Sequence, residues 1–332
     1  MVRSFVFSTQ GKLTARDVAP GGMPALLEDP GLFLWVDLEA VAPEETKAVL
    51  DGVFHFHPLS IQDCIAESPL PKVEEYVRGE RDKFNNYLFI VMHAVDYNRQ
   101  DGVFRTSELN FFLGRNFLVT YHDVPLRSVS STADQCFKGT AQPPRAPDRV
   151  AHTLLDAIVE NYKPALDELA LEIGALEEQA LQDNSKATLN KILLIKKEVV
   201  HLRTIIRPQR EVLARFAHGE FKIIRPHLVP YFRDVYDSLN HIGELAQIYA
   251  DSLTGILQVY LNISSNQTGE VVKLLTLITM MATPMTLVAT WYGMNFKNMP
   301  EYDWKHGYLM AIILTAVSTA GTWWYFKRKK WL

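Results

Sequence analysis

The chain has only two cysteines in its 332 residues, Cys64 and Cys136. They lie far apart and show no CxxC spacing, which excludes a disulfide framework and a cysteine-rich metal site. We expect both to be buried thiols. The N-terminal segment also lacks the apolar core of roughly 7 to 15 residues that a cleaved secretory signal requires.

Several enzyme motifs are missing as well. The sequence contains no GxGxxG fingerprint, P-loop, HExxH helix or nucleophile elbow. We therefore predict a protein that is not an enzyme and binds no nucleotide. His55 and His57 have the spacing of two metal ligands on a strand, but no third ligand lies near them in the sequence. We interpret His57-Pro58 as the start of a helix.

Charged residues are absent from two long stretches, residues 274–296 and 307–326. Each stretch is about as long as the roughly 20 apolar residues with which a helix crosses a bilayer. We predict a first span at about 274–294 and a second at 307–326, joined by an extracytoplasmic loop at 297–306. Because neither span contains Asp, Glu, Lys, Arg or His, a titratable proton relay along them is excluded.

The chain ends in a basic tail at 327–332, although its net charge is −4. A basic segment beside a span marks the cytoplasmic side and attracts anionic lipid. With two spans, both termini are expected in the cytoplasm of a protein in the cell inner membrane. This explanation makes a nucleic-acid partner unnecessary. The tail cations are Lys327, Arg328, Lys329 and Lys330.

Residues 1–145 mix short apolar runs with turn signals and predict a cytoplasmic α/β domain, so the fold class is an α+β domain followed by long helices and two transmembrane helices. The stretch 138–148, rich in proline and small polar residues, predicts a linker. Strands are predicted at 31–40, 87–97 and 108–122, the last as a hairpin around Gly114-Arg115-Asn116, with helices at 42–54 and 57–67.

Helices dominate the rest of the chain. Residues 146–228 predict a cytoplasmic helical hairpin that turns at Asp183-Asn184-Ser185. Between Pro230 and Pro284 there is no proline. We predict one long stalk helix over 229–296 that continues into the first span. A helix of this length is not stable alone, so a homo-oligomer is expected.

A polar stripe runs along the first span, in which threonines recur at spacings of 3, 4, 3 and 4. This spacing places them on one helix face. Such hydroxyls can simply satisfy backbone carbonyls or join helices, but five in register favour a pore face in contact with water. Hydroxyl oxygens suit a hydrated hard cation, whereas zinc or copper would favour Cys, His or carboxylate ligands. The threonines are Thr276, Thr279, Thr283, Thr286 and Thr290.

A short polar turn, Gly293-Met294-Asn295, follows the first span. Glycine allows its backbone carbonyl to turn away from helical hydrogen bonding, and Asn295 offers a side-chain oxygen. Several copies around one axis would form a ring of neutral oxygens that suits an aquated divalent ion. Glu301 in the loop could raise the local cation concentration, although Lys297 and Lys305 nearly cancel the acidic charge there.

The motif YGMNF, followed by MPE, a second span and the ending YFKRKKWL, closely resembles the CorA family of magnesium and cobalt transport proteins. The segments HPLSIQDC, KVEEY and VPYFRDVYDSL extend the resemblance over most of the chain. It implies a funnel-shaped homopentameric channel that carries hydrated Mg²⁺, or Co²⁺ or Ni²⁺, into the cytoplasm. Gly293, Met294 and Asn295 would form its selectivity filter.

The resemblance also implies roles for other residues. Pore-facing positions of the family match Thr286, Thr283, Leu275, Val272 and Gly269, with Leu275 and Val272 as a hydrophobic gate. The chain departs from the family where a methionine often stands at Thr283 and an asparagine at Gly269, which leaves the gate position open.

Family members are closed by intracellular Mg²⁺ bound between subunits through acidic residues. Asp234 matches one such ligand, and Asp96 is the partner expected here. Two carboxylates alone would repel each other, so a bridging divalent ion would stabilise that interface.

Two alternatives remain open. The first is a zinc transporter of the same superfamily, against which Met294 argues because such members usually differ at that position. The second is a membrane-anchored metal sensor whose spans are only anchors. The threonine register argues against the sensor, because an anchor needs no polar face.

Overall fold

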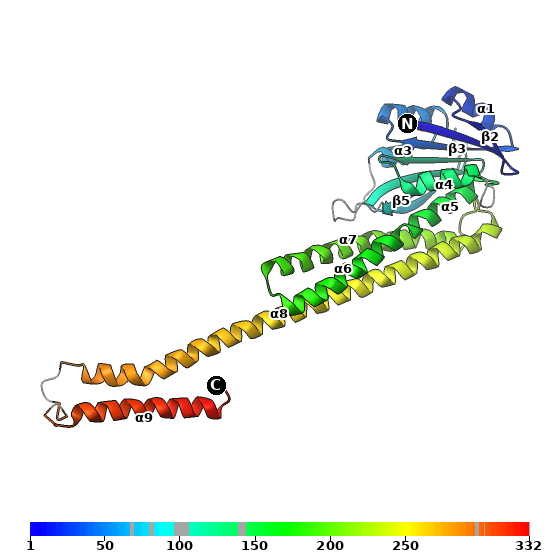
Figure 1. Cartoon of the computed structure of the whole chain (residues 1–332). Helices are drawn as coiled ribbons and strands as arrows, with labels where there is room; N and C mark the ends of the chain where they lie inside the picture. Colours follow the sequence, from blue (N-terminus) through cyan, green and yellow to red (C-terminus); the bar gives the residue numbers. More distant parts are fainter. Residues whose placement is uncertain are drawn as a thin grey trace. The chain divides into compact units, whose positions relative to one another are not determined.

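The computed structural model describes residues 1–66, 70–79, 83–95, 106–138, 144–295, 299–301 and 303–331. The chain forms two compact units (Figure 1). The first contains Met1–Gln179 and Lys186–Ile256, and the second contains Ala180–Ser185 and Leu257–Leu332.

The first unit is built on a sheet whose described strands lie in the order β2-β1-β3-β7-β6-β5-β4. All neighbours are antiparallel except β3 and β7, which are parallel. The strands are β1 (Val2–Ser8), β2 (Leu13–Arg16), β3 (Leu32–Glu39), β4 (Lys72–Tyr76), β5 (Tyr87–Val95), β6 (Thr106–Gly114) and β7 (Phe117–His122).

The predicted strands and hairpin are confirmed. Strands β6 and β7 pair Leu113 with Leu118 across the turn, and a Cβ atom at Gly114 would lie 2.2 Å from the ring of Phe117. Every residue of β7 is buried, which explains its continuous apolar run instead of an alternating pattern. Strands β1 and β2 come from the N-terminal segment, for which the sequence predicts no strand.

Proline at the first turn begins three of the helices that accompany the sheet, as the sequence predicts for two of them. At α3 the Nδ1 atom of His57 accepts the backbone N–H of Leu59 at 3.2 Å, so His57 is a helix cap. The helices are α1 (Met23–Leu27), α2 (Pro43–Gly52), α3 (Pro58–Ile65), α4 (Arg127–Lys138) and α5 (Pro147–Glu160).

The two cysteines differ in burial. Both are free thiols, and Cys64 is buried as expected. Cys136 in α4 is only half-buried, so the prediction of two buried thiols is wrong for it. Part of the predicted linker, residues 139–143, lies outside the described residues, and α5 beyond it packs against β5, β6 and β7.

The predicted helical hairpin is confirmed in α6 (Tyr162–Gln182) and α7 (Lys186–Ala217). At its turn the carboxylate of Asp183 accepts the backbone N–H and the hydroxyl of Ser185, at 3.1 and 2.7 Å. The hydroxyl of Tyr260 donates to the Ser185 carbonyl at 3.0 Å. The turn is therefore fastened to the long helix α8.

The predicted long helix is also confirmed, but it ends at Tyr292 and not at the predicted residue 296. Helix α8 runs without interruption over Val229–Tyr292, 64 residues, and contains Pro284. Helix α9 covers Gly307–Arg328. Both are long and apolar enough to cross a membrane by length and composition, in agreement with the two predicted spans.

Candidate pore face and metal-binding carboxylates

Four threonines of the predicted stripe are exposed and Thr276 is half-buried. Each donates its hydroxyl hydrogen to its own helix. Thr276, Thr279 and Thr283 donate to the carbonyls of the fourth preceding residue at 2.8 Å. Thr286 and Thr290 do the same at 3.1 and 2.6 Å, with a second carbonyl in reach. The hydroxyl hydrogens are therefore used to satisfy backbone carbonyls of α8, which is one of the two roles that the sequence allows for these threonines.

The hydroxyl oxygens still have lone pairs that the helix does not use. A hydroxyl offers one hydrogen and two acceptor lone pairs. Since the hydrogen points back to the helix, the stripe presents acceptors to its surroundings. Val272 and Leu275, below the stripe, are 56% and 64% exposed, and nothing lies within 4 Å of a Cβ atom built at Gly269.

Helix α9 packs against a different face of α8. Because an α-helix turns 100° per residue, the α8 side of the groove between the two helices lies roughly 150° around the helix from the threonines. Helix α9, which lies beside the end of α8 in Figure 1, therefore contacts a face other than the one that carries the threonines. On α8 the groove is lined by Met281, Met285, Val288, Ala289, Tyr292 and Gly293.

The turn after α8 requires a glycine. The backbone N–H of Gly293 still donates to the Ala289 carbonyl at 2.9 Å, and a Cβ atom at Gly293 would lie 2.8 Å from that same oxygen. Any side chain would therefore displace the turn. Gly293, Met294 and Asn295 are all exposed.

The loop toward α9 is closed by backbone contacts of Glu301. Its carbonyl accepts the N–H of Trp304 at 3.3 Å, and a Cβ atom at Gly307 would lie 2.5 Å from that carbonyl oxygen. Lys297 lies outside the described residues. At the far end of α9, Lys327 lies 4.8 Å from the Trp323 ring centre and Arg328 lies 5.4 Å from that of Trp324, a pairing of aromatic and basic residues typical of a membrane interface.

Asp234 is exposed on α8, and its charge acts on an acidic residue that the sequence did not single out. Burial raises the pKa of Asp156 on α5, and the charges of Glu160 and Asp234 raise it further. A carboxyl whose ionisation is opposed by neighbouring carboxylates is suited to a cation. Asp96, the expected partner, lies outside the described residues.

The sequence contained a weak signal for Asp156. It is the only charged residue in the run LLDAIV of α5, and an acid among apolar positions is uncommon unless it has a partner. What the run does not indicate is that α8 supplies a second carboxylate.

Known proteins resemble this chain over most of its length. The family model for the CorA-like Mg²⁺ transporter protein matches residues 31–328. A curated cobalt/magnesium transport protein CorA of Thermotoga maritima is 32% identical over 301 residues, which cover 90% of this chain and 83% of the relative.

Solved structures share the fold. The complete CorA magnesium transporter of Methanocaldococcus jannaschii aligns with a TM-score of 0.81 at 19% identity and covers 100% of this chain and 99% of that one. The ZntB cytoplasmic domain of Vibrio parahaemolyticus aligns with a TM-score of 0.60 at 14% identity, over 80% and 98% of the two chains.

Proposed function

The chain belongs to the family of CorA-like Mg²⁺ transporter proteins, and from this premise we propose that it conducts hydrated Mg²⁺, or Co²⁺ or Ni²⁺, into the cytoplasm. Copies of α8, five in the proposed assembly, surround the path and turn their threonine faces toward it. Both termini lie in the cytoplasm of a cell whose inner membrane holds α9 and the second half of α8.

The observation that carries this proposal is the direction of the threonine hydroxyls. Their hydrogens are used within α8, so the stripe offers acceptor oxygens. The waters around a cation point their hydrogens outward and can donate to such acceptors. Mg²⁺ loses its waters reluctantly, so a path that binds its hydration shell avoids the cost of dehydration.

The same chemistry continues at the end of α8. A ring of Gly293 carbonyls and Asn295 side-chain oxygens offers neutral acceptors to a hydrated ion. The need for glycine at 293 supports a close approach of backbone to ion there. With Thr283 and Gly269 at positions where the family often has larger residues, the gate is proposed at Leu275 and Val272.

Regulation by internal Mg²⁺ is proposed at Asp234. The raised pKa of Asp156 supports a place for Asp156 beside it, and Asp96 remains the proposed partner from a neighbouring subunit. A bound ion would hold the subunits in the closed state and its loss would shift the population toward the open one.

The path is tested by Thr283→Met. In a ring of subunits each methionine adds bulk to the lumen, so Mg²⁺ uptake into proteoliposomes is expected to fall about tenfold. Thr283→Ser keeps the oxygen and its bond to the Thr279 carbonyl, so it is the matched control and should conduct as the native chain does. A methionine variant with native flux would exclude Thr283 from the conduction path.

The regulatory site is tested by Asp234→Ala. The variant is expected to need about tenfold more internal Mg²⁺ for half-maximal block in patch recordings, because one of the ligands is lost. Asp237→Ala removes the same charge from an exposed position three residues further along α8 and should leave the block unchanged. Equal behaviour of the two variants would argue against a bound ion at Asp234.

Uptake of metal ions into proteoliposomes separates this proposal from the two alternatives, a zinc transporter and a membrane-anchored metal sensor. The fold shared with the ZntB domain does not identify the transported ion, so uptake is measured for Zn²⁺ as well as for Mg²⁺, Co²⁺ and Ni²⁺. A membrane-anchored sensor would show no flux of any of them.

A further inference from the structure

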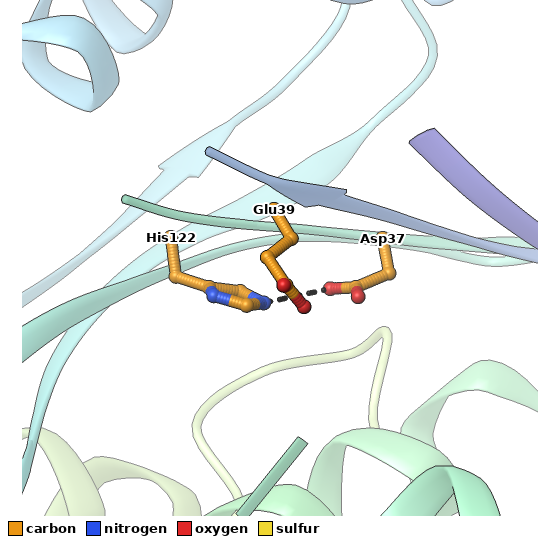
Figure 2. A group of neighbouring side chains, drawn as sticks. All are labelled: Asp37, Glu39 and His122. Atoms are coloured by element: carbon orange, nitrogen blue, oxygen red, sulfur yellow. Dashed lines mark hydrogen bonds and ion pairs between the residues drawn. The ribbon is translucent and has the colours of Figure 1, made fainter. Parts of the chain in front are cut away.

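A second group of metal-ligand side chains lies in the sheet of the first unit, far along the sequence from the pore helix. Oxygens of Asp37 and Glu39 and a ring nitrogen of His122 all lie within 4.8 Å of one another (Figure 2). Asp37 and His122 are fully buried, and the Glu39 side chain is 21% exposed.

The sheet register explains why these residues meet. Strand β3 pairs in parallel with β7, which places Asp37 opposite Thr120 and Glu39 opposite His122. Residues two apart on a strand point to the same face. The three side chains therefore extend from one face at the adjacent carboxyl ends of the two strands.

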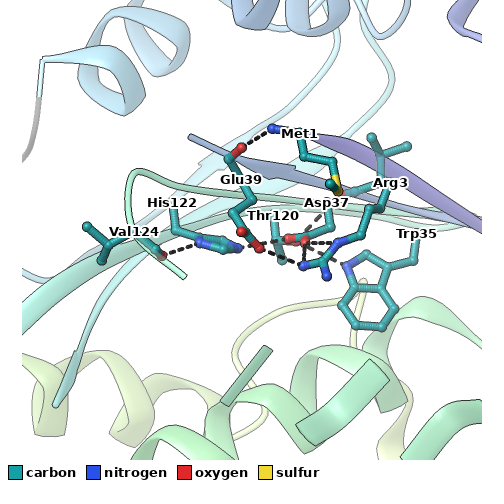
Figure 3. Close-up of polar contacts among 9 residues, drawn as sticks. Met1, Arg3, Trp35, Asp37, Glu39, Thr120, His122 and Val124 are labelled. Carbon is teal, nitrogen blue, oxygen red and sulfur yellow. Dashed lines mark hydrogen bonds and ion pairs between the residues drawn. The ribbon is translucent and has the colours of Figure 1, made fainter. Parts of the chain in front are cut away.

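Two cations of the chain now neutralise the carboxylates (Figure 3). Nη2 of Arg3, on β1, donates to Asp37 Oδ2 at 2.6 Å and to Glu39 Oε2 at 2.9 Å. His122 is the second cation. Its Nδ1 lies 2.6 Å from the Val124 carbonyl and its Nε2 lies 3.2 Å from Asp37 Oδ1.

Both ring nitrogens of His122 face oxygen acceptors, an arrangement that favours the doubly protonated ring. Burial alone would lower the pKa of His122, but the hydrogen bond and charge of Asp37 outweigh it and raise that pKa. Burial likewise opposes ionisation of Asp37, yet His122, Thr120 and Arg3 hold its pKa below the ordinary value. The carboxylates of Asp37 and Glu39 thus meet Arg3 and His122, and the Met1 ammonium donates to the Glu39 backbone carbonyl beside them.

Arg3 can leave this position more easily than the buried residues can. Its side chain is 27% exposed and borders a pocket that also contains the carboxylates of Asp17 and Asp134. Arg16 lines the same pocket, which offers room for the displaced guanidinium. The Nη2 atom of Arg3 contacts both carboxylates and marks a place where a metal ion would reach the same two oxygens. A ring nitrogen of His122 lies within 4.8 Å of an oxygen of each carboxylate.

We propose that Asp37, Glu39 and His122 form a binding site for a borderline dication such as Zn²⁺, Co²⁺ or Ni²⁺, and that Arg3 closes this site when no such ion is bound. On binding, the metal takes the position of the Arg3 nitrogen and His122 releases its Nε2 proton to water.

The ligand set decides the class of metal. One imidazole nitrogen with two carboxylates suits zinc, cobalt and nickel, whereas Mg²⁺ demands oxygen ligands in an octahedron and keeps its waters. The site would thus respond to transition metals in the presence of abundant Mg²⁺. It does not depend on the proposed pore, with which it shares no residue.

Cobalt absorption tests the site directly. Purified, metal-free, full-length protein in detergent is titrated with Co²⁺, whose visible bands become intense when nitrogen and carboxylate ligands replace an octahedral shell of water. The native chain should show such bands. Arg3→Ala should bind Co²⁺ about tenfold or more tightly, because the competing cation is gone, and adding His122→Gln to it should abolish the bands.

Further variants keep the test decisive where replacement of a buried residue harms folding. Glu39→Gln removes a partly exposed ligand and should weaken Co²⁺ binding about tenfold, while Glu75→Gln, on an exposed position of β4, should not. The bands should persist in Asn295→Ala and in excess Mg²⁺. Bands that survive His122→Gln, unchanged Co²⁺ affinity in Glu39→Gln, or bands that Mg²⁺ removes would overturn the assignment. Unchanged affinity in Arg3→Ala would overturn the closing role of Arg3.

Discussion

Replacement of Asn295 with alanine is expected to reduce Mg²⁺ uptake to the level of protein-free liposomes while the oligomer still assembles. Asn295 is exposed beyond the end of α8, so its side chain contributes little to folding. In the proposed ring it supplies the neutral oxygen that accepts hydrogen bonds from the waters of the ion. Alanine has no side-chain acceptor, so every subunit of the ring would lack this oxygen.

The measurement is uptake of Mg²⁺ into proteoliposomes, with size-exclusion chromatography to verify assembly. Asn190→Ala, at an exposed position of α7, removes the same amide away from the path and should transport normally. Native flux through the Asn295 variant would refute its role in selectivity.

Replacement of Gly293 with alanine is expected to reduce Mg²⁺ uptake about tenfold or more. The reason is a displacement of the backbone, because a set of binding groups that moves by even a fraction of an ångström loses its function. The added Cβ atom would lie 2.8 Å from the Ala289 carbonyl oxygen, closer than real contacts allow. The turn that positions Asn295 must therefore shift, although no polar group is lost.

Gly321→Ala on α9 is the matched control, because nothing lies within 4 Å of its added Cβ atom. It should transport as the native chain does. Uptake is measured in the same proteoliposomes at equal protein density. If Gly293→Ala and Gly321→Ala transport alike, the close contact at 293 has no role in conduction.

Much of the fold was predictable because local patterns carry it. The hairpin at Gly114-Arg115-Asn116 has turn residues between two β-rich runs, and the turn at Asp183 begins with a side chain that caps its own backbone. The long helix was predictable from the absence of proline between Pro230 and Pro284. Such patterns depend only on residues that are close in sequence, so they can be recognised without the tertiary structure.

The N-terminal strands were not predictable in the same way. Strand β1 lies between β2 and β3, and its pairing with β3 brings Arg3 opposite Asp37. The sequence of the first residues does not indicate that β1 lies between β2 and β3, because strand order depends on contacts between segments far apart in sequence. The predicted burial of Cys136 failed for a similar reason, since how much of α4 is covered depends on the elements that pack against it.

The sequence by itself determined the two apolar helices, the threonine face of the first and the polar turn that follows it, because helical periodicity and the lack of charge are properties of a continuous segment. Only the tertiary structure decided that α9 contacts a face of α8 other than the threonine face, that the charge of Asp234 acts on Asp156, and that Asp37, Glu39 and His122 meet. These juxtapositions arise from helix packing and from the parallel pairing of β3 with β7, and residues that are distant along the chain acquire a common environment only when such packing forms.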